Sequence, residues 1–280
     1  IFPDRILEEV GADYGITGEG EAAFCDLIDH LEEDPESAYR IYYNYPALLD
    51  GEFTTVKRNS GLVRFYLDKG GMINLQTKRG CPHRCAYCSY PILEGRKYRF
   101  REPEDVAEEV EMLKKDYDVD YFAITDSVFN DASGHYLKIA EEFVRRNLNI
   151  PWMCYLRPDD FKEEEVDLLR RAGLSAIEWG TDCATDTTLK AMKKDFTWDQ
   201  VVHSNNMFAH NGMYNAHFII FGGPGETHET VDEGLTNLLQ LEKCVVFAGI
   251  GVRIFPGTAV HEWALQEDKI RSDQNLLPPS

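Results

Sequence analysis

Short apolar runs alternate with helical patterns along the chain from residue 71 onward. The apolar runs are four to six residues long, which is a length typical of buried strands. They lie at 72–76, 121–125, 151–156, 175–179, 217–221 and 245–248, the last of which continues at 252–254. Between them apolar residues recur at helical spacing, as Val106, Val110 and Leu113 do. Further helical patterns lie near 134–147, 161–172, 197–211 and 226–242.

This alternation predicts an α/β fold built on one parallel sheet, because parallel neighbours need crossover connections, which are usually helices. Six strands make three-quarters of an eight-stranded barrel, whose functional residues follow the C-terminal ends of the strands. Polar residues and glycines fall at these places in the chain. They are the cysteine-rich run 80–88, Asp126, Arg157, Asp182 and the glycine turn 222–225. We therefore expect one rim of the sheet to carry the site.

The first 70 residues follow a different pattern. A glycine-rich stretch at 11–18 predicts a short strand and turn, and 21–31 predicts an amphipathic helix. The expected organisation is an N-terminal element at 1–34, a linker at 35–70, the barrel at 71–260 and the start of a C-terminal extension at 261–280. The chain begins without methionine, and we expect it to be a piece of a longer protein.

Composition and charge exclude some classes of function. The chain of 280 residues is 43% hydrophobic, enough for a core, and no apolar run approaches the roughly 20 residues of a membrane span. A formal charge of −20 argues against nucleic acid as a substrate. Residues 71–101 are the exception, with seven basic residues against the single acid Glu94. This segment is either a patch for an anionic ligand or a solvated loop.

Three of the seven cysteines, Cys81, Cys85 and Cys88, lie within eight residues in the pattern CxxxCxxC. The other four are scattered singly. Iron–sulfur cubanes held wholly by protein take four cysteines, and structural zinc sites are also closed by four ligands. Three thiolates leave one coordination position open, where a small molecule can bind. The spacing therefore favours an open iron–sulfur cluster.

Two other interpretations of the cysteines remain. A zinc site with His83 as the fourth ligand is one, although His83 lies between the first two cysteines and would strain a tetrahedral site. Half of a disulfide framework is the other, which an odd number of cysteines and the absence of a signal peptide argue against. Metal ligation by thiols implies a reducing, cytoplasmic setting.

In this order and spacing, the features over residues 71–260 resemble the radical S-adenosylmethionine (SAM) enzymes. In that family a CxxxCxΦC loop, with Φ aromatic, follows the first strand of a partial (β/α)6 barrel. Here Φ is Tyr87. The resemblance implies that Cys81, Cys85 and Cys88 hold a [4Fe–4S] cluster whose open iron is chelated by the amino and carboxylate groups of SAM. One electron from the cluster then splits SAM into methionine and a 5′-deoxyadenosyl radical.

The resemblance also implies which residues contact SAM. Tyr87 would lie beside the adenine. Asp126 would bind the SAM ammonium, although the segment 125–130 departs from the glycine-rich form common in the family. Arg157 would pair with the SAM carboxylate through its planar guanidinium, and a surface arginine is the alternative.

The later strands add further implied SAM contacts. Asp182 would hold the ribose hydroxyls, and Glu178 on the same strand would point into the barrel, where a buried carboxylate needs a partner. Ile220, Gly222 and Gly223 would let the backbone approach the adenine. No catalytic residue is assigned beyond the cluster and SAM.

The flanking segments resemble a subgroup of the family. Residues 11–21 resemble the tail of a cobalamin-binding, Rossmann-like domain, and 253–258 with His261 and Leu265 resembles the cobalamin-associated members. The DxHxxG motif expected for a histidine ligand of cobalt is absent from the sequence. The resemblance implies cobalamin as a third cofactor and methylation of an unactivated carbon in a small-molecule or lipid-precursor substrate. Its implied partner is an electron donor such as flavodoxin or ferredoxin.

Two alternative functions remain at this point. A tRNA methylthiotransferase-like radical SAM enzyme would need a second cysteine cluster upstream, where only Cys25 occurs, and a basic RNA-binding module. A non-catalytic iron–sulfur or zinc-binding protein would have no use for the implied SAM contacts. The sequence does not identify the substrate.

Overall fold

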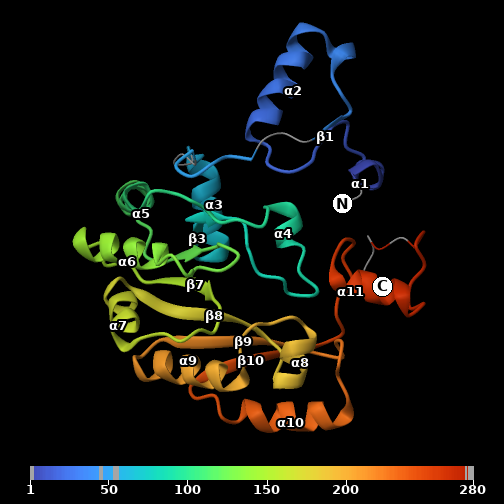
Figure 1. Cartoon of the computed structure of the whole chain (residues 1–280). Helices are drawn as coiled ribbons and strands as arrows, with labels where there is room; N and C mark the ends of the chain where they lie inside the picture. Colours follow the sequence, from blue (N-terminus) through green and yellow to red (C-terminus); the bar gives the residue numbers. More distant parts are fainter. Residues whose placement is uncertain (1–2, 44–46, 53–56, 275, 277–280) are drawn as a thin grey trace.

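A six-stranded parallel sheet is the main feature of the computed structural model, which describes residues 3–43, 47–52, 57–274 and 276 (Figure 1). Its strands are β3 (Ile73–Leu75), β6 (Phe122–Ile124), β7 (Trp152–Leu156), β8 (Leu174–Asp182), β9 (Tyr214–Phe221) and β10 (Cys244–Ile250). They pair in chain order from β3 to β10, and every pair is parallel. β3 and β10 are the two edges, so the sheet is an open, partial barrel. The predicted fold class and its six strands are confirmed.

Helices follow the strands as the sequence predicts. The long ones are α5 (Pro103–Tyr117), α6 (His135–Arg145), α7 (Glu163–Arg171), α9 (Trp198–His210) and α10 (His228–Leu238). In Figure 1 they follow the left and lower sides of the sheet. α5 begins with a proline at its first position, where the missing N–H costs no helical hydrogen bond. Two short helices, α8 (Asp186–Ala191) and α11 (Ala259–Gln266), lie on the right of Figure 1.

The core lies between the sheet and these helices. Phe122, Trp152 and Phe143 form one aromatic group, and Trp179 packs edge-on against Phe208 of α9 with ring centroids 5.3 Å apart. Each such buried aromatic contributes about 1.5–3 kcal/mol. Alternate residues of each strand point to the opposite face of the sheet, where side chains such as Tyr155, Phe218 and Phe247 are exposed to solvent. No helix in the described part of the chain is long and apolar enough to cross a membrane.

The N-terminal part forms a small unit of its own, at the top of Figure 1. Its elements are α1 (Pro3–Val10), β1 (Gly15–Ile16), α2 (Glu21–Glu33), a 3-10 turn (Pro35–Ser37) and β2 (Ile41–Tyr42). β1 and β2 are parallel, and α2 connects them around a satellite core of Ala23, Leu27 and Tyr42. A strand–helix–strand unit of this kind is the repeat of a Rossmann-like sheet. Its assignment to a cobalamin-binding-like domain stays a prediction.

The segment predicted as a linker is more structured than expected. It contains β2 and the helix α3 (Ser60–Gly70), whose Val63 joins the main core. Asn59 caps α3 by accepting a hydrogen bond from the Leu62 N–H. Residues 44–46 and 53–56 of this segment lie outside the described residues, as do 275 and 277–280 of the predicted extension.

Three short elements around the cysteine run were not predicted. β4 (Lys78–Arg79) and β5 (Arg99–Phe100) form an antiparallel ribbon, and α4 (Tyr90–Leu93) lies in the loop between them. Two-residue strands carry too little pattern to be recognised from the sequence. The ribbon matters because the cysteine run lies in the loop that it closes.

We predict that a buried histidine of β9 makes stability depend on pH. The His217 ring lies 2.8 Å from Thr181 Oγ1 and 3.0 Å from Asn205 Oδ1, and burial lowers its pKa to about 4 from an ordinary 6.5. The unfolded chain binds the extra proton first, so the free energy of unfolding is at its full value above pH 6.5 and falls as the pH drops toward 4. We expect a loss of about 2 kcal/mol between about pH 7.5 and about pH 5.

Urea unfolding at the two pH values measures this loss. His217→Asn should reduce the pH dependence, whereas His210→Gln, which changes an exposed ring, should leave it in place. An unchanged pH profile in the His217 variant would assign the effect to other groups.

Candidate active site

The cysteine run lies in a loop whose two ends are joined by the β4–β5 ribbon. Gly80 begins the loop, and its carbonyl accepts a hydrogen bond from Ser127 Oγ at 3.1 Å. The Cys81 N–H donates to the Gly95 carbonyl at 3.1 Å, across the base of the loop. A second fixed point is Ala86, which is buried and lies between Cys85 and Cys88.

Ala86 is held by backbone hydrogen bonds on both sides. Its N–H donates to the Met192 carbonyl at 2.9 Å, and its carbonyl accepts from the Val260 N–H at 3.0 Å. The loop is thus fixed between the segment after α8 and the beginning of α11. These contacts orient the thiols before any cofactor binds.

The three thiols differ in exposure. Cys81 is buried, whereas Cys85 and Cys88 are half-buried and line a cavity of about 330 Å³ together with Arg84 and Arg96. Burial raises the pKa of the Cys81 and Cys88 thiols. Thiolates are the form that binds metal, so these two thiols need nearby positive charge, which iron would supply. The donor set and the adjacent cavity fit an iron–sulfur cluster.

The zinc interpretation gains no support from the side-chain arrangement. Across the described residues, no three His, Cys, Asp or Glu side chains are grouped closely enough to hold a single metal ion. His83 instead lies 3.9 Å from Asp195, measured from Nδ1 to Oδ2. In a cubane each thiolate binds a different iron, so three cysteines that do not converge on one point suit a cluster better than one ion.

Tyr87 of the loop and Asp182 at the end of β8, two predicted SAM contacts, lie side by side. The Tyr87 hydroxyl donates to Asp182 Oδ2 at 2.7 Å. Lys194 donates to the same oxygen and, at 3.1 Å, to the Gly180 carbonyl. Burial alone would lower the pKa of Lys194, but the Asp182 carboxylate raises it well above its ordinary value. This buried ion pair fixes the side chain of Asp182. Asp182 is the last residue of β8, and its φ of 62° puts its backbone in the left-handed region.

Asp126 lies close to the loop, but the chain itself engages both of its carboxylate oxygens. Oδ1 accepts from the Thr77 and Lys78 N–H groups at 2.7 and 3.2 Å, and Oδ2 accepts from Thr77 Oγ1 at 2.5 Å. Asp126 is fully buried, which raises its pKa. In this arrangement Asp126 anchors the start of the β4–β5 ribbon. Its contact with the SAM ammonium remains a prediction.

Two further predicted residues also have partners. Arg157 forms an ion pair with Asp195, and its guanidinium lies 5.0 Å from the centre of the Phe196 ring. Glu178 is the register partner of Tyr155 on the neighbouring strand β7, and burial together with the Glu178 carboxylate raises the pKa of Tyr155. Arg157 is thus already paired within the chain, and the predicted contacts of both residues with SAM remain predictions.

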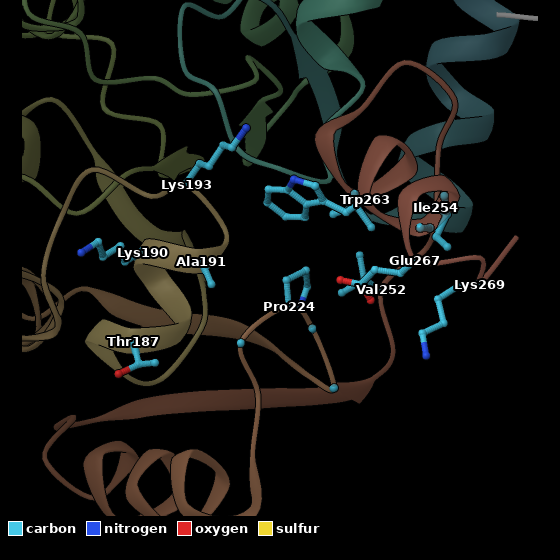
Figure 2. A pocket seen from close by; sticks show the side chains of 15 residues that line it. Thr187, Lys190, Ala191, Lys193, Pro224, Val252, Ile254, Trp263, Glu267 and Lys269 are labelled. Atoms are coloured by element: carbon cyan, nitrogen blue, oxygen red, sulfur yellow. The ribbon is translucent and has the colours of Figure 1, made fainter.

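The remaining predicted contacts lie at the end of β9. Ile220 is half-buried, and Gly222 and Gly223 line a second cavity of about 930 Å³, shown in Figure 2. Lys193 lines this cavity and also the smaller one beside the cysteines. Among the predicted site residues, Cys85 and Cys88 thus line one cavity, Gly222 and Gly223 line another, and Tyr87 and Asp182 are hydrogen-bonded to each other.

More than half of the basic residues of the segment 71–101 form ion pairs within the chain, while Arg84 and Arg96 line the cavity beside the cysteines. Four of its seven basic residues are paired with carboxylates, as Lys78 is with Asp131 at 3.0 Å. The other pairs are Arg79–Glu21 at 2.7 Å, Arg99–Glu19 at 2.5 Å and Arg101–Glu109 at 2.7 Å. Two of these carboxylates belong to the N-terminal unit, so charge joins that unit to the ribbon that carries the cysteines.

We predict that Glu19→Gln loosens the cysteine loop. Glu19 accepts from the Leu48 N–H at 2.9 Å and pairs with Arg79 and Arg99, which flank the loop. Removing the charge should destabilise the closed ribbon by about 1 kcal/mol. Hydrogen exchange of the amides at 78–100 should become about fivefold faster. Glu33→Gln, at an exposed position on α2, is the matched control, and equal rates in the two variants would contradict the prediction.

Comparison with known proteins places this arrangement in a family. The Radical SAM superfamily model matches residues 75–236, more than half of the chain. The anaerobic magnesium-protoporphyrin IX monomethyl ester cyclase of Rubrivivax gelatinosus is 32% identical over 83% of this chain and 46% of its own. The tryptophan 2-C-methyltransferase of Streptomyces laurentii is 27% identical over 69% of this chain and 34% of its own. The chain thus spans about half or less of these relatives.

A solved structure shows the same fold. The radical SAM methyltransferase TsrM from Kitasatospora setae, with tryptophan and a SAM analogue bound, has a TM-score of 0.81 and 26% identity, covering 93% of this chain and 55% of its own. The same protein has been solved with cobalamin and a [4Fe–4S] cluster. The family match, the fold and the cysteine loop lead to one conclusion. This chain belongs to the radical SAM superfamily, whose cofactors are SAM and a [4Fe–4S] cluster.

Proposed function

We propose that the chain is the core of an enzyme that cleaves SAM reductively to a 5′-deoxyadenosyl radical. We propose further that the whole protein uses cobalamin to methylate an unactivated carbon of a small molecule or lipid precursor. The observation that carries the first part is the cysteine loop, clamped at Ala86, with two thiols facing a cavity at the strand ends. The cluster, when bound, supplies the electron that SAM cleavage requires.

The chain's own residues position the cofactors. Cys81, Cys85 and Cys88 would hold the cluster. Asp182 fits the proposed ribose contact, because Tyr87 and Lys194 both donate to Oδ2, and in the described part of the chain no hydrogen bond reaches Oδ1, which a ribose hydroxyl could use. Such fixed donors and acceptors reduce the reorganisation needed during the reaction.

Two observations support the cobalamin part. TsrM, whose structure matches 93% of this chain, is a methyltransferase solved with cobalamin. The parallel β1–α2–β2 unit also has the form of a Rossmann-like fragment, and Glu19 and Glu21 tie it to the cysteine loop. A cobalamin domain attached at this unit would lie close to the cluster. An external reductant such as flavodoxin or ferredoxin would supply the electron.

Anaerobic reconstitution with iron and sulfide, followed by reduction and addition of SAM, tests the proposal. Formation of 5′-deoxyadenosine supports SAM cleavage, and its absence under reducing conditions would favour a non-catalytic iron–sulfur protein. In the full-length protein, methylated product should form only when cobalamin is present. If turnover is unaffected when cobalamin is omitted, the proposal of cobalamin-dependent methylation is wrong, whereas the proposal of SAM cleavage still holds.

A further inference from the structure

The proposed cluster site reaches the protein surface beside the short helix α4. Cys81 is buried, whereas Cys85 and Cys88 are half-buried and line the 330 Å³ cavity. Ile92 of α4 lines the same cavity. A molecule that delivers an electron to a cluster held by these thiols can therefore come close to it over α4.

The cations around this cavity are exposed and unpaired. Arg84, Arg96 and Lys193 line it against one carboxylate, that of Glu262. All three are exposed, and among the described residues none of them forms an ion pair. They differ in this from the four paired basic residues of the segment 71–101. Most of a chain with a net charge of −20 repels an anionic molecule, so these cations steer such a partner to this place.

The helix beside these cations exposes apolar side chains. Tyr90, Ile92 and Leu93, three of the four residues of α4, are 47%, 41% and 55% exposed. Together with Arg84, Arg96 and Lys193 we call them the α4 patch. Aromatic residues and arginine are enriched in protein–protein interfaces, which combine an apolar centre with a polar rim. The composition of the α4 patch therefore suits a protein partner.

The size of the α4 patch favours a brief encounter. One turn of helix and three cations form a small surface, and redox encounters between proteins use small interfaces, below about 1,200 Å² in total. A small anion would account for the cations but not for the exposed apolar side chains. The N-terminal unit pairs with Arg79 and Arg99, which are outside the patch.

We propose that the α4 patch is the docking surface for the protein that reduces the cluster, and that this partner is an acidic one-electron carrier. Carboxylates of the carrier face the three cations, and its apolar surface covers α4. In the complex the carrier loses one electron and the oxidised cluster gains it, with no atom transferred. The assignment rests on the proposed function, which requires an external reductant but does not say where it docks.

Stopped-flow absorbance of the reconstituted chain tests the docking surface without SAM turnover. It measures the rate of cluster reduction by a reduced, acidic flavodoxin and by reduced methyl viologen, a small cation that needs no docking surface. The ratio of the two rates is the readout, so a change in the cluster itself largely cancels. Replacing both Arg84→Gln and Arg96→Gln should lower this ratio about tenfold at low ionic strength, and added salt should shrink the difference from the wild type.

Leu93→Ala tests the apolar part of the patch without a change of charge. Leu93 is more than half exposed, so we expect its truncation to leave folding intact and to lower the ratio about threefold. Two controls are placed on exposed positions of α7 and α10, which lie away from α4 in Figure 1. They are the double change Arg170→Gln and Arg171→Gln, and Leu239→Ala, and both should leave the ratio unchanged.

The possible outcomes separate the docking surface from the proposed function. An unchanged ratio in the arginine variant or in Leu93→Ala, or an equal fall in the controls, would overturn the docking surface and leave the radical chemistry standing. A lower iron content in the arginine variant would assign these residues to holding the cluster and would also overturn it. A wild-type cluster that viologen does not reduce would contradict the proposed function itself.

Discussion

Gly80→Ala is expected to weaken retention of the iron–sulfur cluster by about tenfold or more, although all three cysteines remain. Gly80 has a φ of 85°, and a Cβ built there would lie 2.0 Å from the Lys97 carbonyl oxygen. The side chain therefore forces the two arms of the cysteine loop apart, in addition to a backbone strain of about 1–3 kcal/mol. Iron and sulfide content after anaerobic reconstitution measures the loss.

Gly95 provides a matched control in the same loop. It has a similar φ of 87°, but a Cβ there meets nothing within 4 Å. Gly95→Ala therefore adds the backbone strain without the collision, and it should retain clearly more iron than Gly80→Ala. Equal iron in the two variants would show that closure of the ribbon does not position the thiols.

The second large effect is expected from Cys85→Ala, which should reduce SAM cleavage by more than about 100-fold. Changes to groups that merely support metal ligands already cost about 10–100-fold, so loss of a ligand should exceed that range. The thiol of Cys85 is half-buried beside a cavity, and its removal should change the free energy of unfolding by less than about 1 kcal/mol. Quantifying 5′-deoxyadenosine, together with a urea melt, separates the two effects.

Cys244→Ala serves as the control for this variant. Cys244 is also half-buried, but it lies at the start of β10, away from the loop. We expect it to retain full SAM cleavage. Comparable loss in both variants would indicate that a general effect on the fold, and not cluster ligation, is being measured.

The barrel and the location of its rim could be predicted because they depend on local patterns. Apolar runs alternating with helical spacing define parallel strands, and parallel strands bring the residues that follow them to one edge. The cysteine spacing is equally local. This is why the sequence alone points to Cys81, Asp182 and the glycine turn as candidates, whose roles remain predictions.

The parts that could not be predicted depend on pairs far apart in the chain. Lys194 follows α8 with no motif around it, and only the fold brings it to Asp182. The pairing of Glu19 with Arg99 joins residues 80 positions apart across two structural units. Asp126 shows a different limit: its position near the loop was predictable, but sequence does not show that Thr77 and Lys78 already use its oxygens.

The central claim is that three thiolates hold a cluster with one iron open to SAM. Electron paramagnetic resonance of the reduced, reconstituted chain, recorded with and without SAM, tests it most directly. We expect the signal of one [4Fe–4S] cluster per chain, a shift of that signal when SAM is added, and loss of the signal when Cys81, Cys85 and Cys88 are replaced by alanine. A cluster signal that persists in the triple variant, or that does not respond to SAM in the wild-type chain, would contradict it.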